Sequence, residues 1–302
     1  MEDGDRIRTR NPRVTVGLPV YNGSKYLERA LDAILAQTYR DFELVISDNA
    51  SDDRTPEICR SYAEAESRVL YLRNDENVGA ARNYNRLVEK ARGIYFKWAA
   101  HDDLCAPRYL EACVDVLDRH EEVVLCYPKT RIIDENGKDM GEYHDGLHLD
   151  LPRPHQRFRD VMFRKEGECN AVFGLIRTEV LRRTGLIGSY PASDMILLSE
   201  LSLRGFFHEV PEPLFLRRDH PQTSVRANVS ASARASWFDP KRKPKTPLVH
   251  WRWTAEYSRA IRRSGIEFGE QVRCYRFLGR WMRWNRDRLA EEFGRSVRER
   301  FA

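Results

Sequence analysis

Two adjacent carboxylates, Asp102 and Asp103, follow the apolar stretch YFKWAA and a histidine, His101. Like charges side by side must be solvated, hydrogen-bonded or neutralised by a cation. Mn²⁺ and Mg²⁺ take carboxylate oxygens as ligands and bridge them to the phosphates of a substrate. The pair alone is compatible with a divalent-cation site, although an acidic helix cap is the commoner feature. The alternative is that one of the two carboxylates caps the helix predicted to begin at Pro107.

Three other polar, turn-rich segments follow apolar stretches of the same kind: PVYNG, SDNASDD and RNDENVGAARN. In an open parallel sheet, ligands bind outside the carboxyl ends of the strands. We therefore expect these segments and the HDD sequence to meet at one edge of a sheet. The chain has neither a G-x-G-x-x-G sequence after the first strand nor a P-loop sequence, which argues against those two nucleotide sites.

The elements that must position these segments alternate between strands and helices. Stretches rich in β-branched and apolar residues predict strands, and apolar residues at helical spacing predict helices between them. The predicted strands are 13–22, 41–48, 68–74, 94–100 and 123–133, and the predicted helices are 24–39, 55–66, 79–92 and 107–120. This alternation predicts an α/β fold with a mostly parallel central sheet and helices on both faces.

The pattern changes after about residue 147. Helices are predicted at 157–165, 178–185 and 194–205, and the prolines in 207–218 predict short, interrupted edge strands. We expect one domain over 13–225 that follows a disordered N-terminus, 1–12. A linker or mobile loop at 226–247 and a basic, amphipathic helical region at 248–302 are expected to follow it.

Composition fits a globular protein of one large or two modest domains, with 302 residues of which 41% are hydrophobic. No window predicts a membrane span and the start has no apolar signal segment, so we expect a cytoplasmic protein. The six cysteines show neither CxxC pairs nor zinc-finger spacing, which predicts reduced thiols. The net charge of +5 comes from residues 241–302, which hold 17 basic and 7 acidic residues, so composition does not favour nucleic-acid binding by the rest of the chain.

Several of these segments, in this order and spacing, resemble the family 2 glycosyltransferases. They are PVYNGSKYLERALDAILAQTYRDFELVISDNASDD, NVGAARNYN and AAHDDLCAPRYLE, and the resemblance runs from about Val14 to His220. It implies a GT-A fold, a nucleoside diphosphate-sugar donor, most simply a UDP-sugar, and a Mn²⁺ or Mg²⁺ ion that bridges the donor diphosphate. It also implies that Asp103 is the metal ligand and that Asp102 contacts the donor ribose or sugar. His101 departs from the acidic first position of the family motif.

The same resemblance assigns donor contacts in the first half of the chain. It places three residues beside the nucleobase, one acidic residue on the base or ribose, and one basic residue near the donor. An asparagine stands where many relatives have a second aspartate in the nucleobase turn. These residues are Pro19, Val20 and Tyr21 beside the nucleobase, Asp48 and Asn49 in the turn, and Arg82 near the donor.

The catalytic base is expected in the second half of the chain. An inverting transfer needs a carboxylate close to the acceptor hydroxyl, and the resemblance makes Asp194 the candidate. Asp194 also suits the N-cap of the helix that it begins, and Glu200 is the substitute candidate for the base. By resemblance His220 approaches the metal or the diphosphate, although a histidine in a loop is also an ordinary surface residue. Arg217, Arg218 and Arg226 either pair with phosphate oxygens or are solvated surface charges.

The basic tail contains a helix with two contrasting faces. Arg273, Arg276, Arg280 and Arg283 lie on one stripe, and Cys274, Phe277, Trp281 and Trp284 lie on the adjoining one. Such a helix suits an anionic membrane surface, but packing on the domain or on a second copy of the chain is the commoner use, and we favour packing. Peripheral contact with the inner face of a membrane is the alternative; nucleic-acid binding is the weakest of the three.

Two functions from different classes follow from these observations. The first is an inverting glycosyltransferase that acts on a saccharide or lipid-linked acceptor in glycan, polysaccharide or glycolipid biosynthesis. The second is a non-catalytic module of the same fold that its basic tail recruits to a membrane or an assembly. The departures at His101 and Asn49 leave the second function open.

Overall fold

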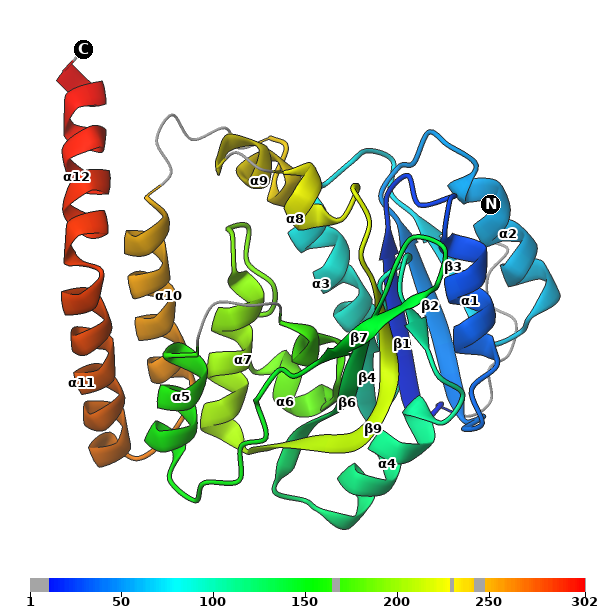
Figure 1. The fold of residues 1–302 in the computed structure, drawn as a ribbon, viewed down its shortest axis with the longest axis horizontal. Coiled ribbons are helices and arrows are strands. Elements are labelled where there is room, and N and C mark those ends of the chain that lie inside the picture. The colour runs from blue at the N-terminus through cyan, green and yellow to red at the C-terminus, as the bar shows by residue number, and fades with distance from the viewer. Residues whose placement is uncertain (1–10, 165–168, 229–230, 242–247, 302) are drawn as a thin grey trace.

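A computed structural model describes residues 11–164, 169–228, 231–241 and 248–301. Residues 1–10 of the expected disordered N-terminus lie outside this range. One mixed sheet crosses the molecule, with helices on both of its faces, and a group of C-terminal helices stands at one side (Figure 1). The strand order is β3-β2-β1-β4-β8-β6-β9-β5, and β7 pairs with β6.

Four parallel strands form the first half of the sheet, as the sequence predicts. They are β1 (Val14–Val20), β2 (Phe42–Asp48), β3 (Val69–Arg73) and β4 (Tyr95–Trp98). The helices between them are α1 (Leu27–Leu35), α2 (Thr55–Ala65) and α3 (Ala80–Lys90), and α4 (Tyr109–Arg119) follows β4. This connectivity brings the carboxyl ends of β1, β2 and β4 to one edge.

The second half of the sheet is mixed rather than parallel. A short strand, β8 (Leu175–Arg177), lies antiparallel between β4 and β6 (Val123–Ile133). The sequence analysis did not predict β8, because three residues before a helical pattern carry little strand signal. The other strands are β5 (Leu104–Cys105), β7 (Asp139–Tyr143) and β9 (Phe206–Arg218).

The expectation of short, interrupted edge strands at 207–218 is wrong. Strand β9 is continuous, runs parallel to β6, and is flanked on its other side by β5. Its register against β6 shifts between the Pro128–Val210 pair and the Thr130–Phe215 pair, which spans Pro211 and Pro213. Because proline lacks a backbone N–H, the hydrogen bonds between β6 and β9 are interrupted at this point and resume at Phe215, although β9 itself continues.

The helices of the second half are α5 (Pro154–Met162), α6 (Thr178–Arg182) and α7 (Ser193–Arg204), with a 3₁₀ turn, η1, at Asn170–Phe173. The segment predicted as a linker contains α9 (Ala231–Phe238), preceded by α8 (Ser224–Ala227). Helix α9 packs near α3, and the carbonyl of Phe238 approaches Gly79 so closely that a Cβ there would lie 2.4 Å from it. Residues 229–230 and 242–247 of the predicted linker lie outside the described residues.

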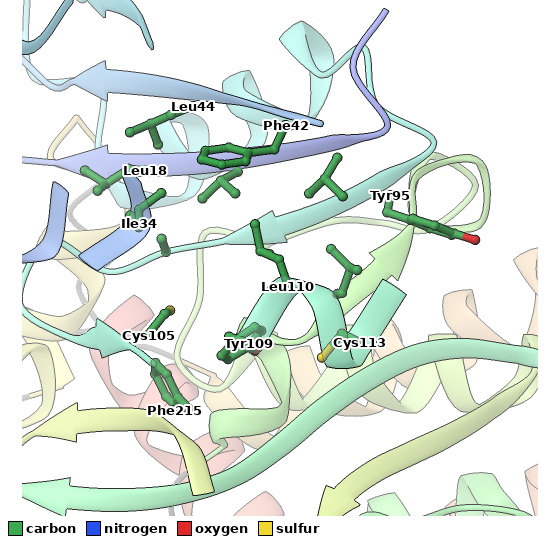
Figure 2. Close-up of a cluster of buried hydrophobic side chains, with 14 of the residues drawn as sticks. Leu18, Ile34, Phe42, Leu44, Tyr95, Cys105, Tyr109, Leu110, Cys113 and Phe215 are labelled. Atoms are coloured by element: carbon green, nitrogen blue, oxygen red, sulfur yellow. The ribbon is translucent and has the colours of Figure 1, made fainter. Parts of the chain in front are cut away.

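Two apolar clusters fasten the helices to the sheet. Side chains of β1 and β2 pack with α1, α2 and α4 on one face; Figure 2 shows Leu18, Phe42 and Leu44 facing Leu110 and Cys113. The opposite face packs with α3, α6 and α7. Such burial contributes roughly 1.5–3 kcal/mol for each large aliphatic or aromatic side chain. The clusters therefore hold the strand ends, and the loops that follow them, in fixed positions.

The C-terminal region forms three helices, α10 (Val249–Arg263), α11 (Phe268–Trp284) and α12 (Arg286–Phe301). Their aromatic face packs on α5 and α7, as favoured above: Cys274 and Trp281 are buried in a cluster with Phe158 and Ile196. Trp284 is the exception, because 75% of its surface is exposed. Within the described residues, no helix is both long enough and apolar enough to span a bilayer.

Candidate functional site

The turns after β1 and β2 are tied to each other. The backbone N–H of Asn22 donates to Ser51 Oγ (2.9 Å), and that of Gly23 donates to Thr55 Oγ1 (2.9 Å). The N–H of Ser24 donates to Asp53 Oδ2 (3.0 Å). Although burial raises the pKa of Asp53, hydrogen bonds from Thr55 and Ser24 outweigh it and lower the pKa to about 2. Asp53 therefore remains ionised and holds the two turns together.

Asp48, the predicted nucleobase contact, is fully buried at the end of β2. Its Oδ1 accepts the N–H of Ser51 (2.9 Å), while its Oδ2 accepts the Tyr71 hydroxyl (2.8 Å) and lies 3.2 Å from Arg73 Nη1. Both carboxylate oxygens are thus engaged within the protein. In this structure Asp48 shapes the turn that follows β2.

Asn49 belongs to a network of buried and half-buried amides at the same edge. Its Oδ1 accepts from Asn74 Nδ2 (3.0 Å) and from the N–H of Val78 (2.9 Å), and its Nδ2 donates to Asn77 Oδ1 (2.8 Å). Asn83 joins the network by bonds to Asn74 and to Ser47. A neutral amide at position 49 can donate and accept at once, which an aspartate cannot. The network joins the ends of β2 and β3 to the start of α3.

The other predicted donor contacts differ in accessibility. Pro19 and Val20 end β1, and the Val20 side chain is buried in the core. Tyr21, the next residue, is 46% exposed at the edge of the sheet. Arg82 is exposed in the first turn of α3. Tyr21 and Arg82 are therefore the members of this set whose side chains can reach a ligand.

The acidic pair lies between β4 and the end of β9. Oδ1 of Asp103 accepts the backbone N–H of Arg218 (2.8 Å), and Oδ2 of Asp102 lies 2.9 Å from His220 Nε2. The N–H of Gln222 donates to His220 Nδ1 (3.3 Å), so Nε2 carries the proton that points at Asp102. The imidazole of His220 therefore contacts the carboxylate of Asp102.

The two carboxylates differ in ionisation. Burial raises the pKa of Asp103 to about 7, and the negative charge of Asp102 adds to this shift. Burial also acts to raise the pKa of Asp102, but the charge of His101 and the hydrogen bond from His220 outweigh it and lower the pKa. Asp102 is therefore ionised at neutral pH, whereas Asp103 needs a further positive charge to be fully ionised.

His101 has a structural explanation in the turn after β1. A Cβ on Gly23 would lie 2.5 Å from His101 Cδ2, so the imidazole rests directly against Gly23. A larger residue than glycine would displace the ring. The imidazole also lies near Asp102, and its charge lowers the pKa of that carboxyl. His101 thus links the loop after β1 to the loop after β4.

The donor set suits a divalent cation in chemistry. Among the described residues, no group of three or more His, Cys, Asp or Glu side chains is arranged as a complete metal site. Asp103 nevertheless supplies a buried, incompletely neutralised carboxylate, and Asp102 lies next to it in the chain. Mg²⁺ and Mn²⁺ commonly bind through one or two carboxylates and take their remaining ligands from water and substrate phosphates. The residues therefore fit a cation that arrives with a diphosphate.

Arg218 is neither a phosphate contact nor a solvated surface charge. Only 1% of its surface is exposed, and its guanidinium donates to the carbonyls of Asp102 (2.9 Å), Asp134 (3.0 Å) and Glu135 (3.2 Å). It therefore holds the backbone of the acidic pair against the turn between β6 and β7. Arg226 pairs with Asp219 at 2.7 Å.

Asp194 lies half-buried in the first turn of α7. This helix follows Ala192, whose φ of 58° is in the left-handed region. Its Oδ1 accepts the N–H of the adjacent Met195 (3.0 Å), and no side-chain cap bond is made at this helix start. Burial raises the pKa of Asp194. A carboxylate with a raised pKa is a better proton acceptor near neutral pH.

Tyr84 of α3, which the sequence pattern did not single out, lies where the charges of both Asp194 and the acidic pair act on it. Burial raises the pKa of its phenol, and the charges of Asp102, Asp103 and Asp194 all act in the same direction. Carboxylates from two separate segments, the acidic pair and the start of α7, therefore act on this one side chain. Tyr84 lies between Asn83 and Asn85. Because asparagines are typical of caps and turns, this segment carried no signal for a functional tyrosine.

Glu200, the substitute candidate for the base, is excluded by its surroundings. Only 1% of its surface is exposed. Its Oε1 accepts from Arg204 Nη2 and Arg263 Nε, both at 3.1 Å, and its Oε2 accepts from Arg263 Nη2 (2.7 Å) and the N–H of Gly185 (3.1 Å). Glu200 joins α7 to α10.

Comparison with known proteins agrees with this fold. The model of the family described as Glycosyl transferase family 2 matches residues 15–185, which is more than half of the chain. The matched segment contains the turns after β1 and β2, the amide network and the acidic pair. The chain belongs to glycosyl transferase family 2.

Its curated relatives are similar over part of their length. An uncharacterized glycosyltransferase of Rickettsia bellii is 33% identical over 143 residues, 46% of this chain and 20% of the relative. The putative glycosyltransferase EpsE of Bacillus subtilis is 33% identical over 127 residues, 42% of this chain and 46% of the relative. The alignments thus span less than half of these relatives.

Solved structures share the fold. S. aureus TarS 1–349 in complex with UDP-GlcNAc superposes with a TM-score of 0.65 at 15% identity, over 89% of this chain and 72% of that one. A mannosyltransferase of Pyrobaculum calidifontis in complex with GDP-Man and Mn²⁺ gives a TM-score of 0.53 at 18% identity, over 94% and 85%. The fold is that of the GT-A glycosyltransferases.

Proposed function

We propose that this protein is an inverting glycosyltransferase that moves a sugar from a nucleoside diphosphate-sugar, a UDP-sugar, to an acceptor hydroxyl. The observation that carries the proposal is that Asp102 and Asp103 follow β4 at the edge where ligands bind in a parallel sheet, and that the half-buried Asp194 at the start of α7 is near enough for all three charges to act on the Tyr84 phenol. Family membership and the UDP-GlcNAc and GDP-Man complexes of the structural relatives support it.

In the proposed reaction the acceptor oxygen forms a bond to the anomeric carbon while the bond to the donor diphosphate breaks. Asp194 accepts the hydroxyl proton, and its half-buried position keeps its pKa raised for that task. Asp103 is the proposed cation ligand. Asp102 is proposed to face the donor, and His220 is proposed to hold Asp102 in position through the contact between its Nε2 and the carboxylate. A bound Mn²⁺ or Mg²⁺ would offset the charge that develops on the leaving diphosphate.

The donor is proposed to lie across the turns after β1 and β2. Tyr21 is exposed beside the expected nucleobase position, and Arg82 lies at the start of α3, so both can contact the donor. Residues 13–225 form the proposed catalytic domain and 248–302 the C-terminal region. The proposed acceptor is a saccharide or a lipid-linked sugar.

A thermal-shift screen tests donor binding directly. UDP is expected to raise the Tm in the presence of Mn²⁺, since a ligand that binds the native state stabilises it by mass action, whereas GDP, CDP and dTDP are expected to do so less. Asp103→Ala is expected to abolish the Mn²⁺-dependent part of the shift. If none of the four diphosphates shifts the Tm with Mn²⁺, the proposed donor site is wrong.

Turnover separates an enzyme from a binding module. Release of UDP from UDP-GlcNAc by hydrolysis or transfer is expected for the wild type, and Asp194→Asn is expected to reduce it at least 10²-fold. The same variant should keep the UDP-dependent Tm shift, because Asp194 lies on the proposed acceptor side. Binding without turnover of UDP-sugars or GDP-Man would favour the non-catalytic module.

A further inference from the structure

The outward face of α11 carries three arginines without a carboxylate partner. Arg276, Arg280 and Arg283 are exposed, and in the described parts of the chain none of them forms an ion pair. Their neighbour Arg273 differs, because it pairs with Glu270 at 3.2 Å. From Gln271 to Asn285 the chain contains no acidic residue at all. This face is therefore an uncompensated positive stripe.

Exposed aromatic rings border the stripe. Phe268 (80% exposed), Trp284 (75%) and Phe293 (60%) are the three most exposed large hydrophobic side chains of the described residues, and all lie on α11 or α12. At 3.6 residues per turn, Phe268 lies on one flank of the arginine stripe and Trp284 on the other. Figure 1 shows both helices at the outer edge of the molecule, with α5 and α10 on their inner side.

A hollow of about 470 Å³ opens beside the stripe, between α5 and α11. It is lined by Arg159, Asp160, Phe163 and Arg280. Asp160 pairs with Arg159 at 2.7 Å, so the net positive charge of the hollow comes from Arg280. The guanidinium of Arg280 lies 5.8 Å from the centre of the Phe163 ring, on which Trp284 also stacks at 6.1 Å. The hollow thus combines one net positive charge with one aromatic ring, that of Phe163, and Trp284 packs against this ring.

These features distinguish between the surfaces that could cover this face. A two-fold dimer through α11 would place the same three arginines opposite one another, which like-charge repulsion disfavours. A solvated face explains the arginines but not the concentration of exposed rings on the same two helices. Arginines flanked by aromatic rings are the composition expected of a helix that lies in the headgroup region of an anionic bilayer.

We propose that the α11 face docks the protein on an anionic membrane surface. Arg276, Arg280 and Arg283 contact lipid phosphates, and the hollow at Arg280 receives a phosphate headgroup. Trp284 and Phe268 insert at the level of the headgroups on either side of the stripe. The proposal does not depend on the transfer reaction, because none of these residues lies among the proposed donor or acceptor contacts.

Vesicle flotation of the full chain tests this proposal. Wild-type protein is expected to float with vesicles of phosphatidylcholine and phosphatidylglycerol, to remain unbound with phosphatidylcholine alone, and to dissociate as salt is added. The triple variant Arg276→Gln/Arg280→Gln/Arg283→Gln is expected to lose roughly a hundredfold in partitioning, at the usual contribution of a basic residue near such a surface. Trp284→Ala is expected to weaken binding even at low salt.

Two exposed arginines on the opposite side of the molecule provide the control. Arg29 belongs to α1 and Arg60 to α2, and both helices lie far from α11. The control variant Arg29→Gln/Arg60→Gln is therefore expected to float like the wild type. The variant Arg276→Gln/Arg283→Gln loses the same charge but is expected to float less. Equal binding by the two double variants, or wild-type binding to neutral vesicles, would overturn the proposal. The proposal would also be overturned if the wild type sedimented as a dimer, the triple variant sedimented as a monomer, and neither protein bound vesicles.

Discussion

Trp253 of α10 donates its indole N–H to the carbonyl oxygen of Pro191 at 2.7 Å. Pro191 precedes Ala192, whose backbone is left-handed. Helix α7 begins at the next residue, Ser193, and Asp194 follows it. The C-terminal region therefore contacts the turn that carries the proposed base. A second tie, between Glu200 and Arg263, fixes the same helix further along. The C-terminal helices are thus part of the support of the proposed acceptor side.

Trp253→Phe is expected to lower turnover about tenfold while leaving UDP affinity unchanged, because it removes one partly buried hydrogen bond to the turn but keeps most of the ring. Steady-state kinetics with calorimetric UDP binding measure the two effects. The matched control is Trp251→Phe on the same helix, whose indole donates instead to Leu289 O of α12 (3.0 Å). Equal kinetic losses in both variants would show that the effect is not specific to the Asp194 turn.

Glu200→Gln is expected to lower the free energy of unfolding by roughly 2 kcal/mol, since it weakens a buried ion pair whose arginine partner is partly exposed. Urea unfolding measures the change. In a double-mutant cycle, Arg263→Gln should cost much less in the Glu200→Gln background than in the wild type. At temperatures where the variant is folded it should retain turnover; a loss as large as that of Asp194→Asn would restore Glu200 as a candidate base.

Asp103→Asn is expected to stabilise the protein at about pH 8 when no divalent cation is present. The folded-state pKa of Asp103 is raised to about 7, above that of an unfolded chain, so its stabilising contribution is present at low pH and is lost as the pH rises through about 7. An asparagine keeps an oxygen for the Arg218 N–H and carries no charge. Thermal unfolding in EDTA should show a gain over wild type at about pH 8 that vanishes near pH 4. A variant that is less stable than wild type at both pH values contradicts this account.

Gly23→Ala is expected to weaken UDP binding and to lower the Tm, because its Cβ would lie 2.5 Å from His101 and 2.6 Å from Val20 Cγ2. The comparison is Gly279→Ala on the exposed side of α11, where a Cβ meets nothing within 4 Å. That change should raise stability by about 0.5–1 kcal/mol through helix propensity. Calorimetry and thermal unfolding of both variants distinguish the local clash from a general effect of removing glycine.

The parallel half of the sheet follows from the sequence because its signals are local. Apolar runs such as Leu44–Ile46 predict strands, the turn residues after them are contiguous, and the family motifs add their order. The same locality made the adjacent carboxylates Asp102 and Asp103 stand out, whereas the resemblance to the family made Asp194 a candidate. The antiparallel strand Leu175–Arg177 could not, because three residues become a strand only through the two neighbours that pair with them.

Only the tertiary structure decided what each of these side chains contacts. The resemblance made Asp48 a contact to the base or ribose, and Glu200 was the substitute candidate for the base, but partners 23 and 63 residues away engage their oxygens. Arg218 read as a surface charge, yet it is buried under the acidic pair. Sequence determined the residue types and local elements, since these depend on neighbours along the chain. Burial, ionisation and hydrogen-bond partners depend on contacts between distant segments, which exist only once the sheet has formed.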